Sequence, residues 1–192
     1  MVLYQITRPL SYLWIEHQQK RKFDWFIPLI FSGISTTILY ISRNHINVYT
    51  PEGLISQILA FIQILPGFYI AALAAISTFN KADIDQLMPE PTPKMEILIQ
   101  GEKNTIDLTR RRFLCMLFAF LVAESIVIAL LAIFALNFAG VIKLLLHPYL
   151  YFQMGINYLF LFIFNTLFWQ LIVSTFLGLY YLGDKMHHPN LN

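Results

Sequence analysis

The chain has 192 residues, of which 57% are hydrophobic and only 12% are charged. A water-soluble domain carries about 25% charged residues, so this composition excludes an ordinary soluble globular protein. The single cysteine, Cys115, excludes an intrachain disulfide. The net charge of +2 says little by itself, but the positions of the basic residues along the chain are informative.

Residues 1–24 form a polar lead in which aromatic residues and leucine mix with basic residues. This mixture predicts a short helix that lies in the cytoplasmic membrane interface and begins near Pro9. A disordered lead, held at the membrane only by its basic run, is the alternative. That run consists of Lys20, Arg21 and Lys22. No signal cleavage site follows, so we expect the first span to be retained as a signal anchor.

Four apolar blocks follow, at 25–42, 54–79, 113–136 and 157–182. A bilayer core of about 30 Å needs about 20 apolar residues in a helix, and each block has close to that length. The sequence therefore predicts an all-α integral membrane protein with four transmembrane helices.

The basic residues predict the orientation of these helices. Eleven of the thirteen Lys and Arg residues lie in 1–24, 80–112 and 183–192. By the positive-inside rule, both termini and the central loop are cytoplasmic, in the inner membrane of a bacterium. The connections at 43–53 and 137–156 then face outward, and they hold the other two basic residues.

The cytoplasmic loop at 80–112 combines a stiff proline-containing stretch at 88–93 with two runs of alternating apolar and polar residues, at 95–100 and 105–109. The four residues 101–104 between the runs contain Gly and Asn, so the pattern predicts a β-hairpin over 95–109. An isolated hairpin is marginal in water, so we expect it to pack on the membrane, another protomer or a soluble partner. The residues predicted to dock a partner are Glu96, Ile97, Ile99, Lys103, Ile106 and Asp107.

The third span is expected to begin at a Thr109 cap, followed by Arg110, Arg111 and Arg112 at headgroup depth. These arginines either form a specific site for anionic lipid or serve only to set the orientation of the helices in the membrane. After the third span, 137–156 is too apolar for a free loop and too interrupted for a span. We expect an outer interfacial helix that ends before Pro148, with a re-entrant segment as the alternative.

Counting at about 1.5 Å per residue from the cytoplasmic edge places several polar or small residues near the bilayer midplane. This predicted layer consists of Thr36, Gly67, Glu124 and Gln170. No Lys or Arg lies at that depth, so Glu124 is expected to be protonated, to face water, or to bond to Gln170 and a hydroxyl. It serves either as an interhelical anchor or in ion conduction, proton conduction or sensing.

Small residues recur every fourth position on the second span, at Gly67, Ala71 and Ala75, which predicts a smooth face for helix packing. Pro66 removes a backbone hydrogen bond in mid-membrane and is expected to kink this span.

The sequence contains no glycine-rich phosphate loop, no His-Glu-x-x-His, no Cys-x-x-Cys and no acid-rich metal motif. We therefore expect a protein that is not an enzyme, with no metal site and no cofactor. Topology accounts for the basic residues, so direct binding of nucleic acid has no support.

Two functional hypotheses fit these features. The first is a non-catalytic subunit that senses membrane state or anchors a cytoplasmic partner. The second is a small channel or pore-forming effector, with Glu124 and Gln170 lining the pathway. A four-helix unit encloses little space, so both hypotheses favour a homo-oligomer in contact with membrane lipids.

Four spans with both ends inside, a central loop reading PEPTPKMEILIQGEKNTIDLTRRR, and no catalytic motif together resemble the KwaA family. KwaA proteins are the membrane subunits of Kiwa, a two-gene bacterial anti-phage system. The resemblance covers the layout of the whole chain and transfers no site residues. It implies a cytoplasmic partner, KwaB, which is similar to nucleic-acid-acting proteins, and a role in detecting phage attack at the envelope.

Because a carboxyl near the bilayer centre costs about 2.5–3.5 kcal/mol, Glu124 is the strongest candidate for a functional residue. We expect Glu124→Ala to abolish function while leaving expression intact. The measurement is phage resistance of the host alongside the amount of protein in the membrane fraction. Full activity of the variant would remove Glu124 from the site.

Overall fold

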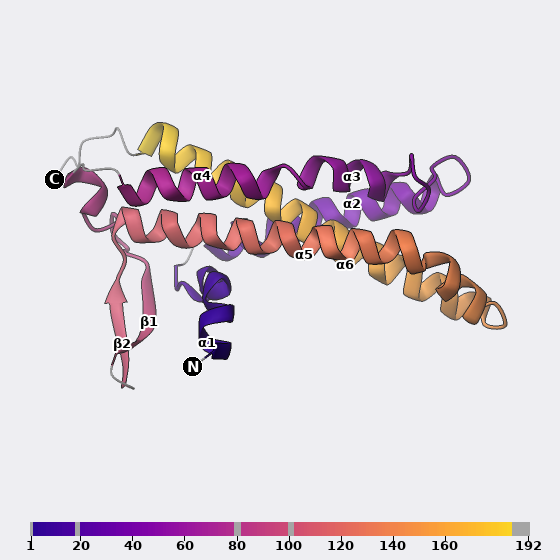
Figure 1. Ribbon diagram of the computed structural model, residues 1–192, viewed down its shortest axis with the longest axis horizontal. Coiled ribbons are helices and arrows are strands. Elements are labelled where there is room, and N and C mark those ends of the chain that lie inside the picture. The colour runs from indigo at the N-terminus through magenta and orange to yellow at the C-terminus, as the bar shows by residue number, and fades with distance from the viewer. Residues whose placement is uncertain (1, 18–19, 79–81, 100–101, 186–192) are drawn as a thin grey trace.

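The computed structural model describes residues 2–17, 20–78, 82–99 and 102–185. It contains four helices that are long and apolar enough to cross a membrane, at Lys22–Ile41, Leu54–Thr78, Arg110–Leu145 and Leu150–Gly183. Four such helices with a small two-stranded sheet confirm the predicted elements of the fold, while the cytoplasmic placement of the termini stays a prediction. The helices run along the long axis of the molecule, and the sheet lies at one end (Figure 1).

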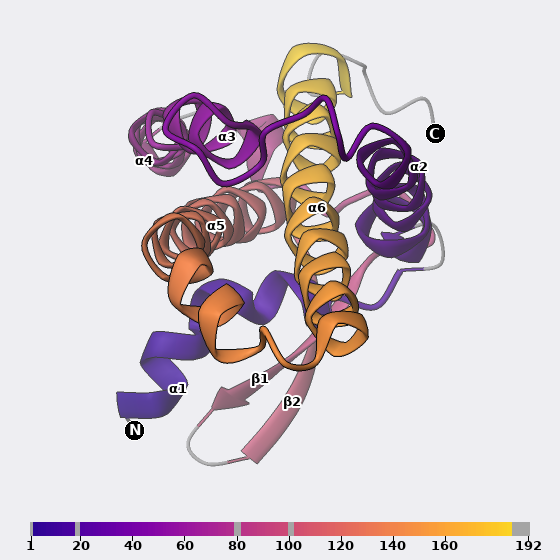
Figure 2. The same ribbon diagram turned by 90° about the vertical axis from the view of Figure 1, so that its right-hand side faces the viewer.

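The elements in chain order are α1 (Val2–Thr7), η1 (Arg8–Trp14), η2 (Lys22–Phe26), α2 (Ile27–Ile41), α3 (Leu54–Ile62), α4 (Leu65–Thr78), η3 (Ala82–Asp85), β1 (Lys94–Ile99), β2 (Glu102–Asp107), α5 (Arg110–Leu145), α6 (Leu150–Tyr180) and η4 (Tyr181–Lys185). Viewed along the bundle, α6 lies between α2 on one side and α5 with α3 and α4 on the other (Figure 2).

The second span is interrupted near its middle, as Pro66 predicts. Helix α3 ends at Ile62 and α4 begins at Leu65, with Pro66 in its first turn. Proline lacks an N–H and is tolerated at the start of a helix, so the break falls immediately before it.

Helices α5 and α6 are longer than the predicted spans. Thr109 caps α5 as expected, because its hydroxyl accepts a hydrogen bond from the Arg112 N–H. The helix then continues to Leu145, so the expected separate helix within 137–156 is replaced by the ends of α5 and α6. Residues 137–145 contain no proline, and their one glycine costs only about 1 kcal/mol, so the helix ends only near Pro148. The two ends extend together beyond α2 and α3 (Figure 1).

Helix α5 provides the centre of the core. Its residues Leu114, Leu117, Leu121 and Ile128 are at most 1% exposed and follow one another at spacings of three, four and seven, which places them on one stripe. Helix α5 contacts η1, α3, α4 and α6.

The N-terminal lead packs against α5, and its expected place in the membrane interface stays a prediction. Tyr12 is fully buried, and its ring lies 5.1 Å from that of Phe120 and 6.0 Å from that of Phe113. Helix α1 ends before Pro9, and the chain continues as a 3-10 helix. Tyr12 thus attaches the lead to α5, whereas Ile6 and Trp14 of the same lead are 69% and 65% exposed.

Strands β1 and β2 pair antiparallel and confirm the predicted hairpin, with Met95 opposite Ile106 and Ile99 opposite Glu102. The expected four-residue turn at 101–104 is corrected, because β2 already begins at Glu102. Only residues 100 and 101 separate the strands, and two-residue connections are the commonest in hairpins. The hairpin projects away from the helices (Figure 1).

Arg111 joins the start of α5 to the end of α4 and to η3. Its guanidinium donates 2.6 and 2.9 Å hydrogen bonds to the two carboxylate oxygens of Asp85, and a 2.7 Å bond to the Ile76 carbonyl. These bonds hold the pKa of the Asp85 carboxyl below its usual value.

A carboxyl whose pKa is lower in the folded than in the unfolded chain stabilises the fold at any pH above its unfolded-state pKa, which is about 4. This contribution is lost as the pH falls through the lower, folded-state pKa. We therefore expect the protection factor for amide hydrogen exchange in η3, which is the exchange rate of an unfolded chain divided by that of the folded chain at the same pH, to stay constant down to about pH 4 and to fall below it. In Arg111→Gln, exchange should already be fast at neutral pH. Unchanged exchange in this variant would contradict the assignment.

Candidate functional site

A buried polar site lies between α5 and α6. Gly178 of α6 lies against Leu117 of α5, because an added Cβ at Gly178 would meet Leu117 Cδ2 at 3.3 Å. Glu124 is two turns after Leu117, while Ser174 and Gln170 are about one and two turns before Gly178. Since the two helices run antiparallel, these steps bring Gln170 to about the level of Glu124 and Ser174 to within about one turn of it, on facing surfaces.

The three side chains are almost completely buried, with 4% of Glu124, 2% of Gln170 and none of Ser174 exposed. Among the described residues, neither carboxylate oxygen of Glu124 has a hydrogen-bond partner, and the same holds for Gln170 Nε2 and Ser174 Oγ. Each such atom costs about 1–3 kcal/mol when nothing compensates it. The site thus holds four buried polar atoms that form no hydrogen bond within the described part of the chain.

A second buried cluster, formed by Tyr12, Lys20 and Asp24, lies close to this site. Tyr12 Oη donates a 3.1 Å hydrogen bond to Asp24 Oδ1, and Lys20 Nζ pairs with Asp24 Oδ2. The Lys20 ammonium also lies 4.2 Å from the centre of the Tyr12 ring. Both Tyr12 and Asp24 are near enough to Glu124 for their charges to interact. The cluster therefore ties the lead to the start of α2 beside the buried carboxyl.

Burial shifts the pKa values of Tyr12 and Lys20 in this cluster. It raises the pKa of Tyr12 well above its usual value, and the neighbouring Asp24 carboxylate acts in the same direction. Burial also lowers the pKa of Lys20, while the contact with Asp24 opposes that shift. The ammonium of Lys20 thus depends on the Asp24 carboxylate for its charge.

Thr36 does not join Glu124 and Gln170. Its hydroxyl accepts a 3.2 Å hydrogen bond from Asn165 Nδ2, five residues before Gln170 on α6, or about 7.5 Å along the helix axis. Other α2–α6 hydrogen bonds accompany it: Ser32 Oγ to the Phe162 carbonyl, Thr166 Oγ1 to Ser32 Oγ, and Trp169 Nε1 to Ser35 Oγ. The residues of the predicted layer therefore separate: Glu124 and Gln170 lie in the buried site, whereas Thr36 lies in the contact between α2 and α6.

The face of the second span that carries the small residues points away from the bundle. Gly67, Ala71 and Ala75 are all exposed, and a Cβ added at Gly67 would meet nothing within 4 Å. The opposite side of α4 faces the bundle, where Tyr69 Oη is 2.6 Å from Thr175 Oγ1. The small face is available to lipid or to another chain.

The six basic residues predicted at headgroup depth divide into two groups. Lys20 and Arg110 are each 7% exposed, and Arg111 bonds to Asp85 and to the end of α4. The exposed members are Arg21, Lys22 and Arg112.

The predicted docking residues of the hairpin differ in exposure. Glu96 and Asp107 are exposed, whereas Ile97 and Ile106 are half-buried. The side chains of Ile99 and Lys103 lie outside the described part of the chain. Met95 and Leu108 are buried at the base of the hairpin, with 3% and 0% exposed, and they fix it to the rest of the chain.

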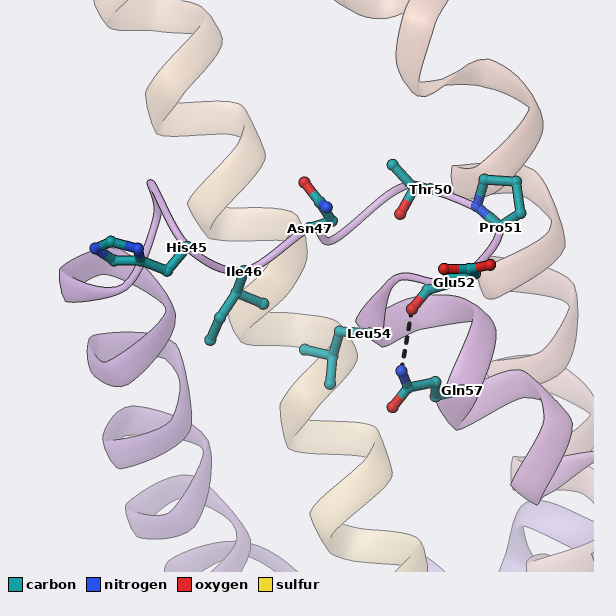
Figure 3. A pocket seen from close by; sticks show the side chains of 8 residues that line it. All are labelled: His45, Ile46, Asn47, Thr50, Pro51, Glu52, Leu54 and Gln57. Atoms are coloured by element: carbon teal, nitrogen blue, oxygen red, sulfur yellow. Dashed lines mark hydrogen bonds between the residues drawn. The ribbon is translucent and has the colours of Figure 1, made fainter.

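A pocket of about 570 Å³ lies at the other end of the bundle, in the connection between α2 and α3 (Figure 3). Its lining residues are His45, Ile46, Asn47, Thr50, Pro51, Glu52, Leu54 and Gln57. Gln57 Nε2 donates a 3.0 Å hydrogen bond to the Glu52 backbone carbonyl. Most of these side chains are exposed, and they form no pairing of a nucleophile with a base.

No known protein family, curated protein or solved structure matches this chain. In the described ranges, no group of three or more His, Cys, Asp and Glu residues is placed to hold a metal ion. The interpretation of the buried site therefore rests on its own chemistry.

Sequence reasoning missed Ser174, Asp24 and Tyr12. Ser174 follows Gln170 by four residues, and Asp24 follows Lys20 by four, so helical spacing alone places each on the same face as its neighbour. No local signal pairs Tyr12 with α5.

We expect Asp24→Asn to destabilise the protein by about 3 kcal/mol or more, because it leaves the Lys20 ammonium buried without a counter-charge. Thermal unfolding in detergent and protease cleavage of the lead measure this loss.

The double variant Lys20→Met/Asp24→Leu removes both charges and should recover most of the stability. Glu52→Gln, at an exposed position, is the matched control and should be neutral. Equal stability of Asp24→Asn and the double variant would show that the ion pair does not hold the lead in place.

Proposed function

We propose that this protein is a non-catalytic membrane subunit that anchors a cytoplasmic protein at the bacterial inner membrane, with the hairpin as its docking surface. The observation that carries the proposal is the free edge of β2. Among the described residues, β2 pairs only with β1, and the hairpin projects from the bundle. An unpaired strand edge is a template for strand addition by another chain.

The base of the hairpin is firmly attached, which suits a docking element. Glu16 of the lead and Lys94 of β1 exchange two backbone hydrogen bonds, of 3.0 and 3.2 Å. The lead is held in turn by Tyr12 against α5 and by Asp24 of η2, immediately before α2. A rearrangement of the helices would therefore move the hairpin, and this is the physical route by which the subunit would sense membrane state.

The positive-inside rule supports a cytoplasmic hairpin with both termini on the same side. The resemblance to the membrane subunits of Kiwa supports KwaB as the partner and phage attack as the stimulus. Assembly into a homo-oligomer is part of the proposal, and the outward face at Gly67, Ala71 and Ala75 suits close approach of a second copy.

A pore is less well supported. A conducting pathway needs polar side chains on a surface that water reaches, whereas Glu124 and Gln170 are 4% and 2% exposed within a single chain.

Recruitment of the protein encoded by the neighbouring gene tests the proposal. We expect a fluorescent form of that protein to move from the cytosol to the membrane when the full chain is co-expressed. Replacing 96–105 by Asn-Gly keeps Met95 paired with Ile106 in a two-residue turn while removing the free edge. This shortened variant should leave the partner in the cytosol.

The matched control is His45→Ala in the connection at the opposite end, which should recruit normally. Both variants must reach the membrane fraction in the same amount as the parent chain. A partner that stays cytosolic with the intact chain, or that is recruited equally by the shortened hairpin, would overturn the proposal.

A further inference from the structure

An ionised Glu124 in the buried site between α5 and α6 would have no counter-charge of its own among the described residues. Lys20 and Asp24 form a pair with no net charge, so their cluster supplies no excess positive charge to Glu124. The other ionisable groups in electrostatic range, Tyr12 and Tyr69, add none. One negative charge is balanced by a proton or by a single monovalent cation, whereas a divalent ion would leave an excess.

A proton on Glu124 would balance the charge but would not satisfy the neighbouring groups. Gln170 Nε2 and Ser174 Oγ would still lack partners among the described residues. The two ends of an amide side chain are assigned from their surroundings, so Gln170 equally presents its carbonyl oxygen to this site after a half-turn. The site then offers carboxylate, amide and hydroxyl oxygens, all of them hard ligands.

We propose that Glu124, Gln170 and Ser174 form a binding site for one sodium ion inside the helix bundle. Hard oxygen donors with a single negative charge suit a small monovalent cation. The ion would use the lone pairs of all three side chains and neutralise the carboxylate, which removes the cost of burying it. This site does not depend on the proposed docking of a partner, since it lies between α5 and α6 and not in the hairpin.

A hydrophobic carbodiimide tests the site in the purified full chain, because it modifies a protonated carboxyl in apolar surroundings and a bound ion excludes that proton. We expect labelling of Glu124, located by peptide mass, to slow as sodium chloride replaces choline chloride at constant pH and ionic strength. Glu124→Gln should lose the label, which distinguishes it from any label on Asp24.

Two serines give a matched pair of variants. Ser174 Oγ has no partner in the described chain, whereas Ser125, equally buried on α5, donates a 2.9 Å hydrogen bond to the Val122 carbonyl of its own helix. Loss of one ligand in Ser174→Ala should raise the half-protecting sodium concentration about tenfold, equivalent to about 1.4 kcal/mol. Ser125→Ala should leave it unchanged.

Protection of Glu124 from labelling by sodium and not by choline supports the site. This comparison uses the parent chain, so it does not depend on the folding of a variant. Labelling that depends on pH alone and ignores sodium would overturn it in favour of a protonated glutamate with bridging water. An equal shift in Ser174→Ala and Ser125→Ala would also overturn it, because the effect would then come from repacking and not from a lost ligand.

Discussion

Packing on α5 is the constraint on which the rest of the molecule depends. In lipid, helices gain little by hiding apolar surface from one another, so close contact and hydrogen bonds decide which faces meet. Helix α5 meets η1, α3, α4 and α6, and its stripe of fully buried leucine and isoleucine lies between them. The hairpin is attached to the same helix through Leu108 and the Thr109 cap.

Polar contacts then join α6 to the other spans. Helix α2 has its main contact with α6, through hydroxyl and amide side chains that bond across this contact. Similarly, Tyr69 joins α4 to α6, and Tyr49 Oη donates a 2.5 Å hydrogen bond to Asn157 at the end of the bundle opposite the hairpin. In contrast to these satisfied contacts, Glu124 is buried without a hydrogen-bond partner among the described residues.

The sequence was sufficient for the features that depend on local periodicity. Apolar length predicted the four spans, alternation predicted the hairpin, and Pro66 predicted the break between α3 and α4. It was insufficient where a side chain's partner is remote. Counting residues gives depth along an axis but not the direction a side chain faces, so Thr36 was grouped with Glu124 although it bonds to Asn165. The burial of Tyr12 depends on aromatic residues of α5 that no local pattern connects to it.

The position of Tyr12 has a consequence for biosynthesis. The lead leaves the ribosome before the four spans, but the two α5 rings that bury Tyr12, Phe113 and Phe120, are made only after the first two spans. Tyr12 therefore stays outside its final packing during insertion of the first helical pair. Tyr12 can pack on α5 only when the third span is complete. This packing then attaches β1 to the helix bundle through the backbone hydrogen bonds of Glu16. The hairpin thus acquires its final support as a late step of assembly, when most of the chain is already in the bilayer.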